Sequence, residues 1–303
     1  MTSISSFFRY TEIKTKITSV FAFSLCLAFF AMKGWPVRPL PTVLFFLAMF
    51  LFDLVTTAIN NYVDSRTDKK TVLPFSRPRA LAIIWILLFL SLGLSLWLLT
   101  MSGLFLLVLG GLSFLTGIFY TYGPLPISRL PLGEFMSGLF YGLFIPWIFF
   151  YINLEPVLFM DWHYQAPYLG LTLHLPHLAS HFLLSLLPFA TTANIMLANN
   201  ICDLEKDLLQ GRRTLPGIIG VRWSLGLFAL LAALPFLALG SMVLAGILRP
   251  VALIGLLAAI PVARSVVLFF ARQDKTQTFP LALRMYIITM TAGIAGVLAG
   301  RWI

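Results

Sequence analysis

The stretch ALAIIWILLFLSLGLSLWLL, at residues 80–99, contains no charged side chain. A helix needs about 20 apolar residues to cross the hydrocarbon layer of a bilayer, and this stretch has that length. The whole chain shares its character: 59% of the 303 residues are hydrophobic, only 11% are charged, and the mean hydropathy is +0.94. Soluble proteins carry about 25% charged residues. The composition therefore excludes a soluble enzyme, a secreted disulfide-rich scaffold and a disordered chain.

Similar apolar runs recur along the sequence and predict nine membrane-spanning helices in a single transmembrane domain, residues 1–303. Open sheet edges find no hydrogen-bond partner in lipid, and the runs lack the alternation of barrel strands, so we expect an all-α fold. The expected spans are residues 17–33, 40–60, 80–99, 102–121, 133–152, 178–199, 223–246, 250–271 and 281–300.

The net charge of +10 reflects orientation in a membrane, and we expect no nucleic-acid partner. With nine spans, sixteen of the 21 Lys and Arg residues fall on the same face as the N-terminus, four on the other face, and Arg264 within a span. Cytoplasmic loops carry an excess of Lys and Arg. We therefore expect a multi-pass cell-membrane protein with a cytoplasmic N-terminus, whose first span is retained and not cleaved as a signal peptide.

Two matched motifs stand out from this apolar background. Residues 60–68 read NNYVDSRTD and residues 199–207 read NNICDLEKD, and both fit NNxxDxxxD. Each lies at the expected cytoplasmic end of an even-numbered span, and together they hold four of the six Asn and four of the seven Asp residues. A charged loop end that anchors a span is a sufficient explanation for a single motif of this kind. Two matched motifs on the same face are poorly explained by chance or by a solvated loop. The repetition indicates two related halves with one acidic helix end each.

Helical spacing places the polar residues of each motif on one face, because positions four apart lie above one another. Asp53 extends the first face into the membrane, where a charge is costly, so we expect it to point into the bundle near Thr57. The expected polar stripes are Asn60, Asp64 and Asp68 in the first motif, and Asn199, Asp203 and Asp207 in the second.

Carboxylates gathered in this way require a cation, since like charges otherwise disfavour ionisation. Oxygen ligands without His or Cys suit Mg²⁺ or Ca²⁺, and Mg²⁺ commonly binds a few carboxylates together with substrate phosphates. Acidic and basic residues together predict a clamp for a diphosphate, and an apolar cavity beneath it favours an isoprenoid diphosphate. The neighbouring basic residues are Arg66, Lys69, Lys70, Lys206, Arg212 and Arg213.

Both motifs resemble the aspartate-rich motifs of the UbiA superfamily of intramembrane aromatic prenyltransferases. NNYVDSRTD is similar to the first NxxxDxxxD motif of that family, and NNICDLEKD to the second. YTYGPLPISRLPLGEF, at residues 120–135, resembles a segment of the 1,4-dihydroxy-2-naphthoate polyprenyltransferase (MenA) branch. DLLQGRRTLP, at residues 207–216, resembles the segment that follows the second motif in the same branch.

The resemblance implies helices around a central cavity open to the cytoplasm, and a Mg²⁺-dependent transfer from polyprenyl diphosphate to an aromatic acid. In the MenA branch the acceptor is 1,4-dihydroxy-2-naphthoate, which loses carbon dioxide in a step of menaquinone biosynthesis. The implied metal ligands are Asp64, Asp68, Asp203, Asp207 and Asn60, and the implied residue facing the allylic cation is Tyr120. The implied substrate contacts are Asn60, Asn61, Arg66, Lys69, Lys70, Asn199, Asn200, Lys206, Arg212, Arg129 and Glu134.

Alternatives remain open at this point. The MenA branch often has Arg at the position of Cys202 in this chain. Relatives that use 4-hydroxybenzoate often carry a Lys after the loop tyrosine, whereas the nearest basic residue here is Arg129. These differences leave the aromatic acceptor open, and 4-hydroxybenzoate is the alternative to 1,4-dihydroxy-2-naphthoate. Two related halves also suit a transporter, although the acidic pairs lie at helix ends and not at the midplane. Tyr120 could belong to the interfacial aromatic belt, and Glu134 could stabilise a helix N-terminus.

Overall fold

The computed structural model describes residues 3–67, 72–123, 126–154 and 159–301, and these fold almost entirely into helices. The chain divides into two compact units, one formed by Met1–Val20 with Arg38–Ser128 and the other by Phe21–Val37 with Arg129–Ile303. Helix α2, Ile17–Lys33, passes from the first unit into the second. Each unit carries one of the two acidic motifs.

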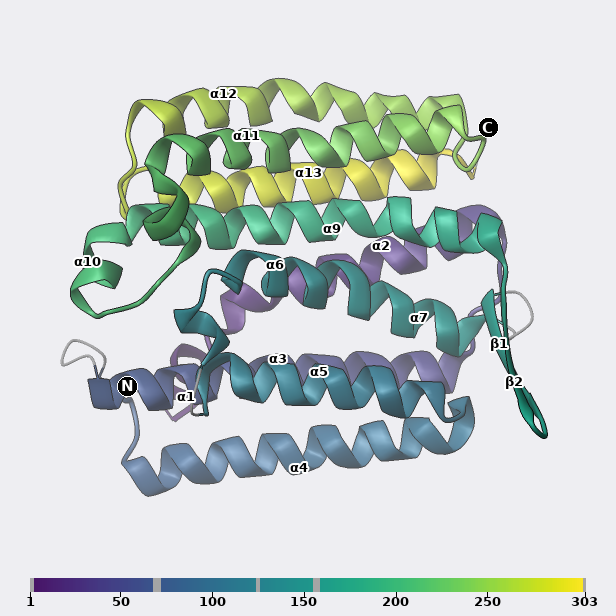
Figure 1. The fold of residues 1–303 in the computed structure, drawn as a ribbon, viewed down its shortest axis with the longest axis horizontal. Coiled ribbons are helices and arrows are strands. Elements are labelled where there is room, and N and C mark those ends of the chain that lie inside the picture. The colour runs from purple at the N-terminus through teal and green to yellow at the C-terminus, as the bar shows by residue number, and fades with distance from the viewer. Residues whose placement is uncertain (1–2, 68–71, 124–125, 155–158, 302–303) are drawn as a thin grey trace. The chain divides into compact units, whose positions relative to one another are not determined.

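In the first unit three long helices run side by side, as the lower part of Figure 1 shows. Their core is formed by apolar side chains of α3 and α4 that repeat at helical spacing, and the short N-terminal helix is tied to it by the Tyr10 hydroxyl, which donates to the carbonyl of Ala80 at 3.3 Å. The elements are α1 (Ser3–Tyr10), the 3₁₀ turn η1 (Ile13–Lys16), α3 (Pro39–Thr67), α4 (Arg77–Ser102) and α5 (Phe105–Thr121).

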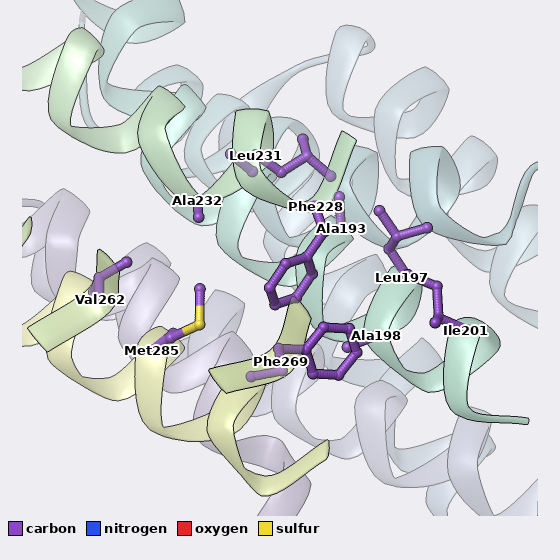
Figure 2. Packing of buried hydrophobic residues seen from close by; sticks show 12 residues of the cluster. Ala193, Leu197, Ala198, Ile201, Phe228, Leu231, Ala232, Val262, Phe269 and Met285 are labelled. Carbon is purple, nitrogen blue, oxygen red and sulfur yellow. The ribbon is translucent and has the colours of Figure 1, made fainter. Parts of the chain in front are cut away.

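In the second unit α9 packs against α11 and α13, with α12 beside α13. Figure 2 shows the buried cluster between these helices, in which the rings of Phe228 and Phe269 stack with centroids 4.4 Å apart. The long elements are α9 (Leu175–Cys202), α11 (Leu215–Leu244), the 3₁₀ segment η4 (Pro250–Ala258), α12 (Ala259–Ala271) and α13 (Phe279–Ala299), and the short helix is α10 (Leu204–Leu209). The short 3₁₀ turn η2 (Ile127–Arg129) includes the last residues of the first unit and the first residue of this segment of the second.

The same unit contains a helix interrupted by a π-helical segment, composed of α6 (Gly133–Gly138), η3 (Leu139–Phe144) and α7 (Ile145–Asn153). Gly142 lets this segment approach α9 closely: a Cβ atom at that position would lie 2.3 Å from the Cα of Phe189. Small residues commonly permit such backbone contacts between membrane helices.

All nine predicted apolar runs coincide with helices. Among the described residues, eight helical stretches are long and apolar enough to cross a membrane, and Phe105–Thr121 is a shorter apolar helix. The predicted span 80–99 corresponds to Arg77–Ser102, which begins with Pro78 in its first turn and ends before Gly103 at φ 89°. Pro at a helix start and Gly after its end are the usual boundary residues. These helices indicate a multi-pass membrane protein.

The segment before α9 differs from the all-helical expectation. Strands β1 (Met160–Gln165) and β2 (Tyr168–Leu173) pair antiparallel, with Met160 opposite Leu173. Both flanks of the turn carry exposed tyrosines, Tyr164 and Tyr168. The hairpin lies outside the predicted spans, where its backbone hydrogen bonds can be completed by water as well as by the partner strand.

Candidate active site

The first acidic motif lies in the last turns of α3, where Asn60 and Asp64 are four residues apart within the helix. Asp68, Lys69 and Lys70 lie outside the described residues. The Oδ1 atom of Asn60 accepts a hydrogen bond of 3.2 Å from the hydroxyl of Thr121. This bond joins the end of α5 to the motif, and Tyr120, half-buried, precedes Thr121 in the same helix.

Asn61 is directed to the N-terminal segment. Its Nδ2 atom donates to the carbonyl of Tyr10 at 2.9 Å and to Oε1 of Glu12 at 3.3 Å. Tyr10 ends α1, and Glu12 adopts a left-handed backbone conformation at φ 48°. Asn61 therefore anchors this segment against α3, and its contact with substrate remains a prediction.

Basic and aromatic side chains gather on the same end of α3. The guanidinium of Arg66 lies 5.3 Å from the ring centre of Tyr62, and that of Arg77 lies 5.7 Å from the same ring. Arg77 also donates to the carbonyl of Ser65 at 3.2 Å. The face of an aromatic ring attracts cations. The ring of Tyr62, within the first motif, therefore holds the guanidinium groups of Arg66 and Arg77 close to it. Sequence reasoning named Arg66 but missed Tyr62 and Arg77.

The second acidic motif is divided between two helices, whereas the sequence pattern predicts its polar residues on one helix. Helix α9 ends at Cys202 and α10 begins at Leu204, with Asp203 between them. The backbone N–H of Asp203 still donates to the carbonyl of Asn199 at 2.9 Å, and that of Asp207 to the carbonyl of Asp203 at 2.8 Å. Because both bonds join residues four apart, the motif keeps helical spacing across the break.

A lysine from a distant loop engages this motif. The ammonium of Lys275 donates to Oδ1 of Asn199 and to Oδ2 of Asp203, and it lies 4.7 Å from the ring centre of Phe279. Sequence reasoning missed Lys275, because 72 residues separate it from Asp203. Its only sequence signal is its place between the last two predicted spans, on the same expected face as the motif.

Asp207, the last residue of the second motif, is buried, 4% exposed, and Nη1 of Arg212 lies 3.8 Å from its Oδ1 atom. Burial raises the pKa of Asp207, whereas the Arg212 guanidinium acts in the opposite direction. The backbone N–H of Arg212 also donates to the carbonyl of Asp207 at 2.9 Å. Lys206, in contrast, is exposed.

The start of α6 lies beside the second motif. Nδ2 of Asn200 donates to Oε1 of Glu134 at 2.8 Å, and Glu134 is 4% exposed. Among the described residues, Oε2 of Glu134 has no hydrogen-bond partner. The carbonyl of Arg129 accepts from the backbone N–H of Arg213 at 3.0 Å, so the segment before α6 is joined to the segment after α10.

The described residues include no cluster of three or more His, Cys, Asp or Glu side chains that could hold a metal ion. Asp203 is instead grouped with an amide and an ammonium, and Asp207 with a guanidinium. Within the second motif, Asn199 and Asp203 are the two side chains whose oxygens bind the same cation.

Comparisons with known proteins agree with this fold. The chain is 29% identical to 1,4-dihydroxy-2-naphthoate octaprenyltransferase of Bacillus subtilis (strain 168) over 150 residues, which are 49% of this chain and 42% of that protein. The matched region thus spans less than half of that relative.

Solved structures are similar over most of their length. A UbiA homolog from Aeropyrum pernix K1 has a TM-score of 0.65 at 17% identity, covering 91% of this chain and 96% of that one. A UbiA homolog from Archaeoglobus fulgidus bound to GPP and Mg²⁺ has a TM-score of 0.61 at 14% identity, covering 97% of this chain and 99% of that one. The model of the UbiA prenyltransferase family matches residues 20–288. Because the family model covers most of this chain, the chain belongs to the UbiA prenyltransferase family.

Proposed function

We propose that this protein transfers a polyprenyl group from polyprenyl diphosphate to an aromatic acceptor, with Mg²⁺ as cofactor. Family membership supports the prenyl transfer, and the similarity to a UbiA homolog bound to GPP and Mg²⁺ supports the donor class and the metal. The naphthoate acceptor is supported by the partial match to a 1,4-dihydroxy-2-naphthoate octaprenyltransferase. We further propose that the acidic motifs and the N-terminus face the cytoplasm at the cell membrane.

One observation carries the metal assignment: an amide oxygen of Asn199 and a carboxylate oxygen of Asp203 already bind one cation, the ammonium of Lys275. Carboxylate and carbonyl oxygens are the ligands that Mg²⁺ prefers. The donor set therefore fits the metal, and Asp207 follows one helical turn later. In this proposal the first motif adds Asn60, Asp64 and Asp68 by the same chemistry.

The basic residues supply the charge that a diphosphate requires. Arg212 lies next to Asp207, and Arg66 and Lys206 lie at the ends of the two motifs. When the donor C–O bond breaks, the negative charge of the leaving diphosphate grows, and fixed cations stabilise that charge. Bound Mg²⁺ would add Lewis-acid stabilisation of the same oxygens. Lys69 and Lys70 extend the basic set in this proposal.

The allylic cation left by this cleavage is attacked by a ring carbon of the acceptor. Tyr120, one residue before the Thr121 that contacts the first motif, is the aromatic side chain proposed to face that cation. With 1,4-dihydroxy-2-naphthoate, the new C–C bond forms at the carbon that bears the carboxylate. The electron pair of the bond to that carboxylate returns to the ring as carbon dioxide leaves.

The buried carboxylate of Glu134 is proposed to bind a hydroxyl group of the acceptor. Oε1 is held by Asn200, and Oε2 has no partner among the described residues, so a hydroxyl donor would satisfy it. A buried oxygen that lacks a partner costs free energy. Arg129, five residues before Glu134, is proposed to bind the carboxylate of the acceptor through its positive charge.

Product analysis with several acceptors tests this function. Purified protein in lipid nanodiscs is supplied with one prenyl diphosphate, Mg²⁺ and equal amounts of 1,4-dihydroxy-2-naphthoate and 4-hydroxybenzoate, and the products are identified by mass spectrometry. A decarboxylated prenyl naphthoquinol as the main product supports the full proposal. Prenyl 4-hydroxybenzoate as the main product keeps the transferase but overturns the acceptor, and the absence of any prenylated product contradicts the transferase.

A further inference from the structure

The loop between α12 and α13 is built to present one lysine. The carboxylate oxygen Oδ1 of Asp274 accepts backbone N–H bonds from Thr276 at 2.9 Å and Gln277 at 2.8 Å. The backbone N–H of Asp274 donates to the hydroxyl of Thr278 at 2.8 Å. These bonds on both sides of Lys275 fix the turn from which its side chain extends.

Lys275 binds the second motif through two oxygen atoms, those of Asn199 and Asp203. Its side chain is 41% exposed and that of Asp203 is 24% exposed, so ions can reach the pair from solvent. The ammonium thus occupies oxygens that the proposed function assigns to a metal site, but it is tethered to the chain and remains accessible to exchange.

We propose that Lys275 is a resident counter-ion of the second motif, which Mg²⁺ displaces and which then contacts the diphosphate. This inference rests on the proposed function. Mg²⁺ requires its oxygen ligands at 2.0–2.1 Å, so a metal bound to both Asn199 and Asp203 takes the position between their oxygens that the ammonium holds. Lys carries three donors on a flexible four-carbon stem, which lets the displaced ammonium turn to phosphate oxygens that arrive with the metal.

The exchange makes metal and diphosphate binding cooperative. Without diphosphate, the metal must expel Lys275 and leave its charge close by, which weakens metal binding. With diphosphate, the expelled ammonium gains a new anionic partner, which strengthens the ternary complex. Such reciprocal effects are a coupling free energy between two ligands. The arrangement keeps the motif neutralised until the donor substrate arrives.

A matched control exists in the same loop. Arg272 also carries one positive charge, but it pairs with Asp274 at 3.4 Å and its side chain is 61% exposed. Lys275→Met and Arg272→Met remove the same charge from positions three residues apart. Only Lys275→Met removes a group that contacts Asn199 and Asp203. Lys275→Arg keeps the charge, and Lys275→Gln is a second neutral variant if Lys275→Met yields little folded protein.

The test measures two affinities in detergent-purified protein. Mn²⁺ replaces Mg²⁺ and is titrated by electron paramagnetic resonance without diphosphate, and inorganic pyrophosphate is titrated by calorimetry at saturating Mg²⁺. Lys275→Met should tighten Mn²⁺ binding about threefold to tenfold and weaken pyrophosphate binding by a similar factor, as for loss of a partly exposed ion pair. Arg272→Met should change either affinity by less than about twofold.

Each result decides a separate point. Unchanged or weaker Mn²⁺ binding in Lys275→Met and Lys275→Gln overturns the displacement. Tighter Mn²⁺ binding with unchanged pyrophosphate binding overturns the contact with diphosphate. Asp203→Asn separates this inference from the proposed function: if wild type and Asp203→Asn bind Mn²⁺ equally, the metal site itself is wrong, whatever Lys275 does.

Discussion

The ammonium of Lys16 lies 2.9 Å from Oδ1 of Asp53, and the two side chains are only 3% and 6% exposed. The hydroxyl of Ser19 donates to Oδ2 of the same carboxylate at 2.7 Å, and the ammonium also contacts Thr57. Asp53 therefore points into its unit beside Thr57, as its position on the polar face of α3 predicts. The partner, Lys16, is the last residue of η1, directly before α2, and lies 37 residues away in the sequence.

Separating this pair should destabilise the protein strongly. Removing one partner of a buried ion pair leaves an uncompensated charge and costs about 3–5 kcal/mol. We expect Lys16→Met or Asp53→Leu alone to lower the free energy of unfolding by that amount, measured by denaturant titration in mixed micelles. The double variant should recover much of the loss, because two apolar residues of similar volume can replace a buried pair. Additive losses in the double variant would show that the two residues are not coupled.

Close packing of η3 on α9 gives a second prediction. A Cβ atom at Gly142 would lie 2.3 Å from the Cα of Phe189, whereas a Cβ atom at Gly110, in α5, would meet nothing within 4 Å. Gly142→Ala should therefore cost about 1–3 kcal/mol through overpacking, seen as a lower melting temperature in detergent. Gly110→Ala should leave the melting temperature unchanged or slightly higher, since Ala favours helix. Equal melting temperatures for the two variants would contradict this packing.

The fold was predictable because it depends on composition over windows of about 20 residues. Nine uncharged or nearly uncharged runs correspond to helical stretches, and their limits agree to within a few residues, except that α3 continues to Thr67 and α11 begins at Leu215. That earlier start follows from Pro216 in the first turn, before Gly220 interrupts helical geometry at φ 81°. The hairpin at residues 160–173 was missed, since no window of that length reveals two six-residue strands.

The candidate site was predictable only where it depends on local spacing. Asn60 and Asp64 lie one turn apart in α3, as helical periodicity requires. Lys275 and Tyr62 were not identified, because their contacts are set by how helices pack and by how a loop turns, and no spacing in the sequence encodes these. The break at Asp203 was missed for a related reason: NNICDLEKD has no Gly or Pro to mark it.

Glu134 offers a prediction about the acceptor. Glu134→Gln keeps the size of the side chain but replaces a carboxylate with an amide, so the acceptor's hydroxyl loses a charged hydrogen-bond partner. The KM for the acceptor should rise about tenfold or more, while the KM for the prenyl diphosphate stays within about twofold. Glu205→Gln, an exposed carboxylate in α10, is the control. A larger effect on the donor KM than on the acceptor KM would place Glu134 elsewhere in the reaction.

The two acidic motifs should each be indispensable. Asp64→Asn and Asp203→Asn remove one anionic ligand from each motif while keeping side-chain size, and each should lower kcat/KM at least about 100-fold. Their melting temperatures without metal should remain near the wild-type value, because both side chains are partly exposed. Asp161→Asn, on strand β1, is the control and should retain activity. Full activity in either motif variant would remove that motif from the site.

The most direct test of the central claim is the metal dependence of product formation by the wild-type protein. Protein in nanodiscs is freed of metal with EDTA, supplied with prenyl diphosphate and 1,4-dihydroxy-2-naphthoate, and titrated with Mg²⁺ while the product is quantified by mass spectrometry. The account predicts no product in EDTA and full recovery on adding Mg²⁺, with pyrophosphate released in equal amount. Undiminished product in EDTA, or hydrolysis of the diphosphate without prenyl transfer at any Mg²⁺ concentration, would contradict it.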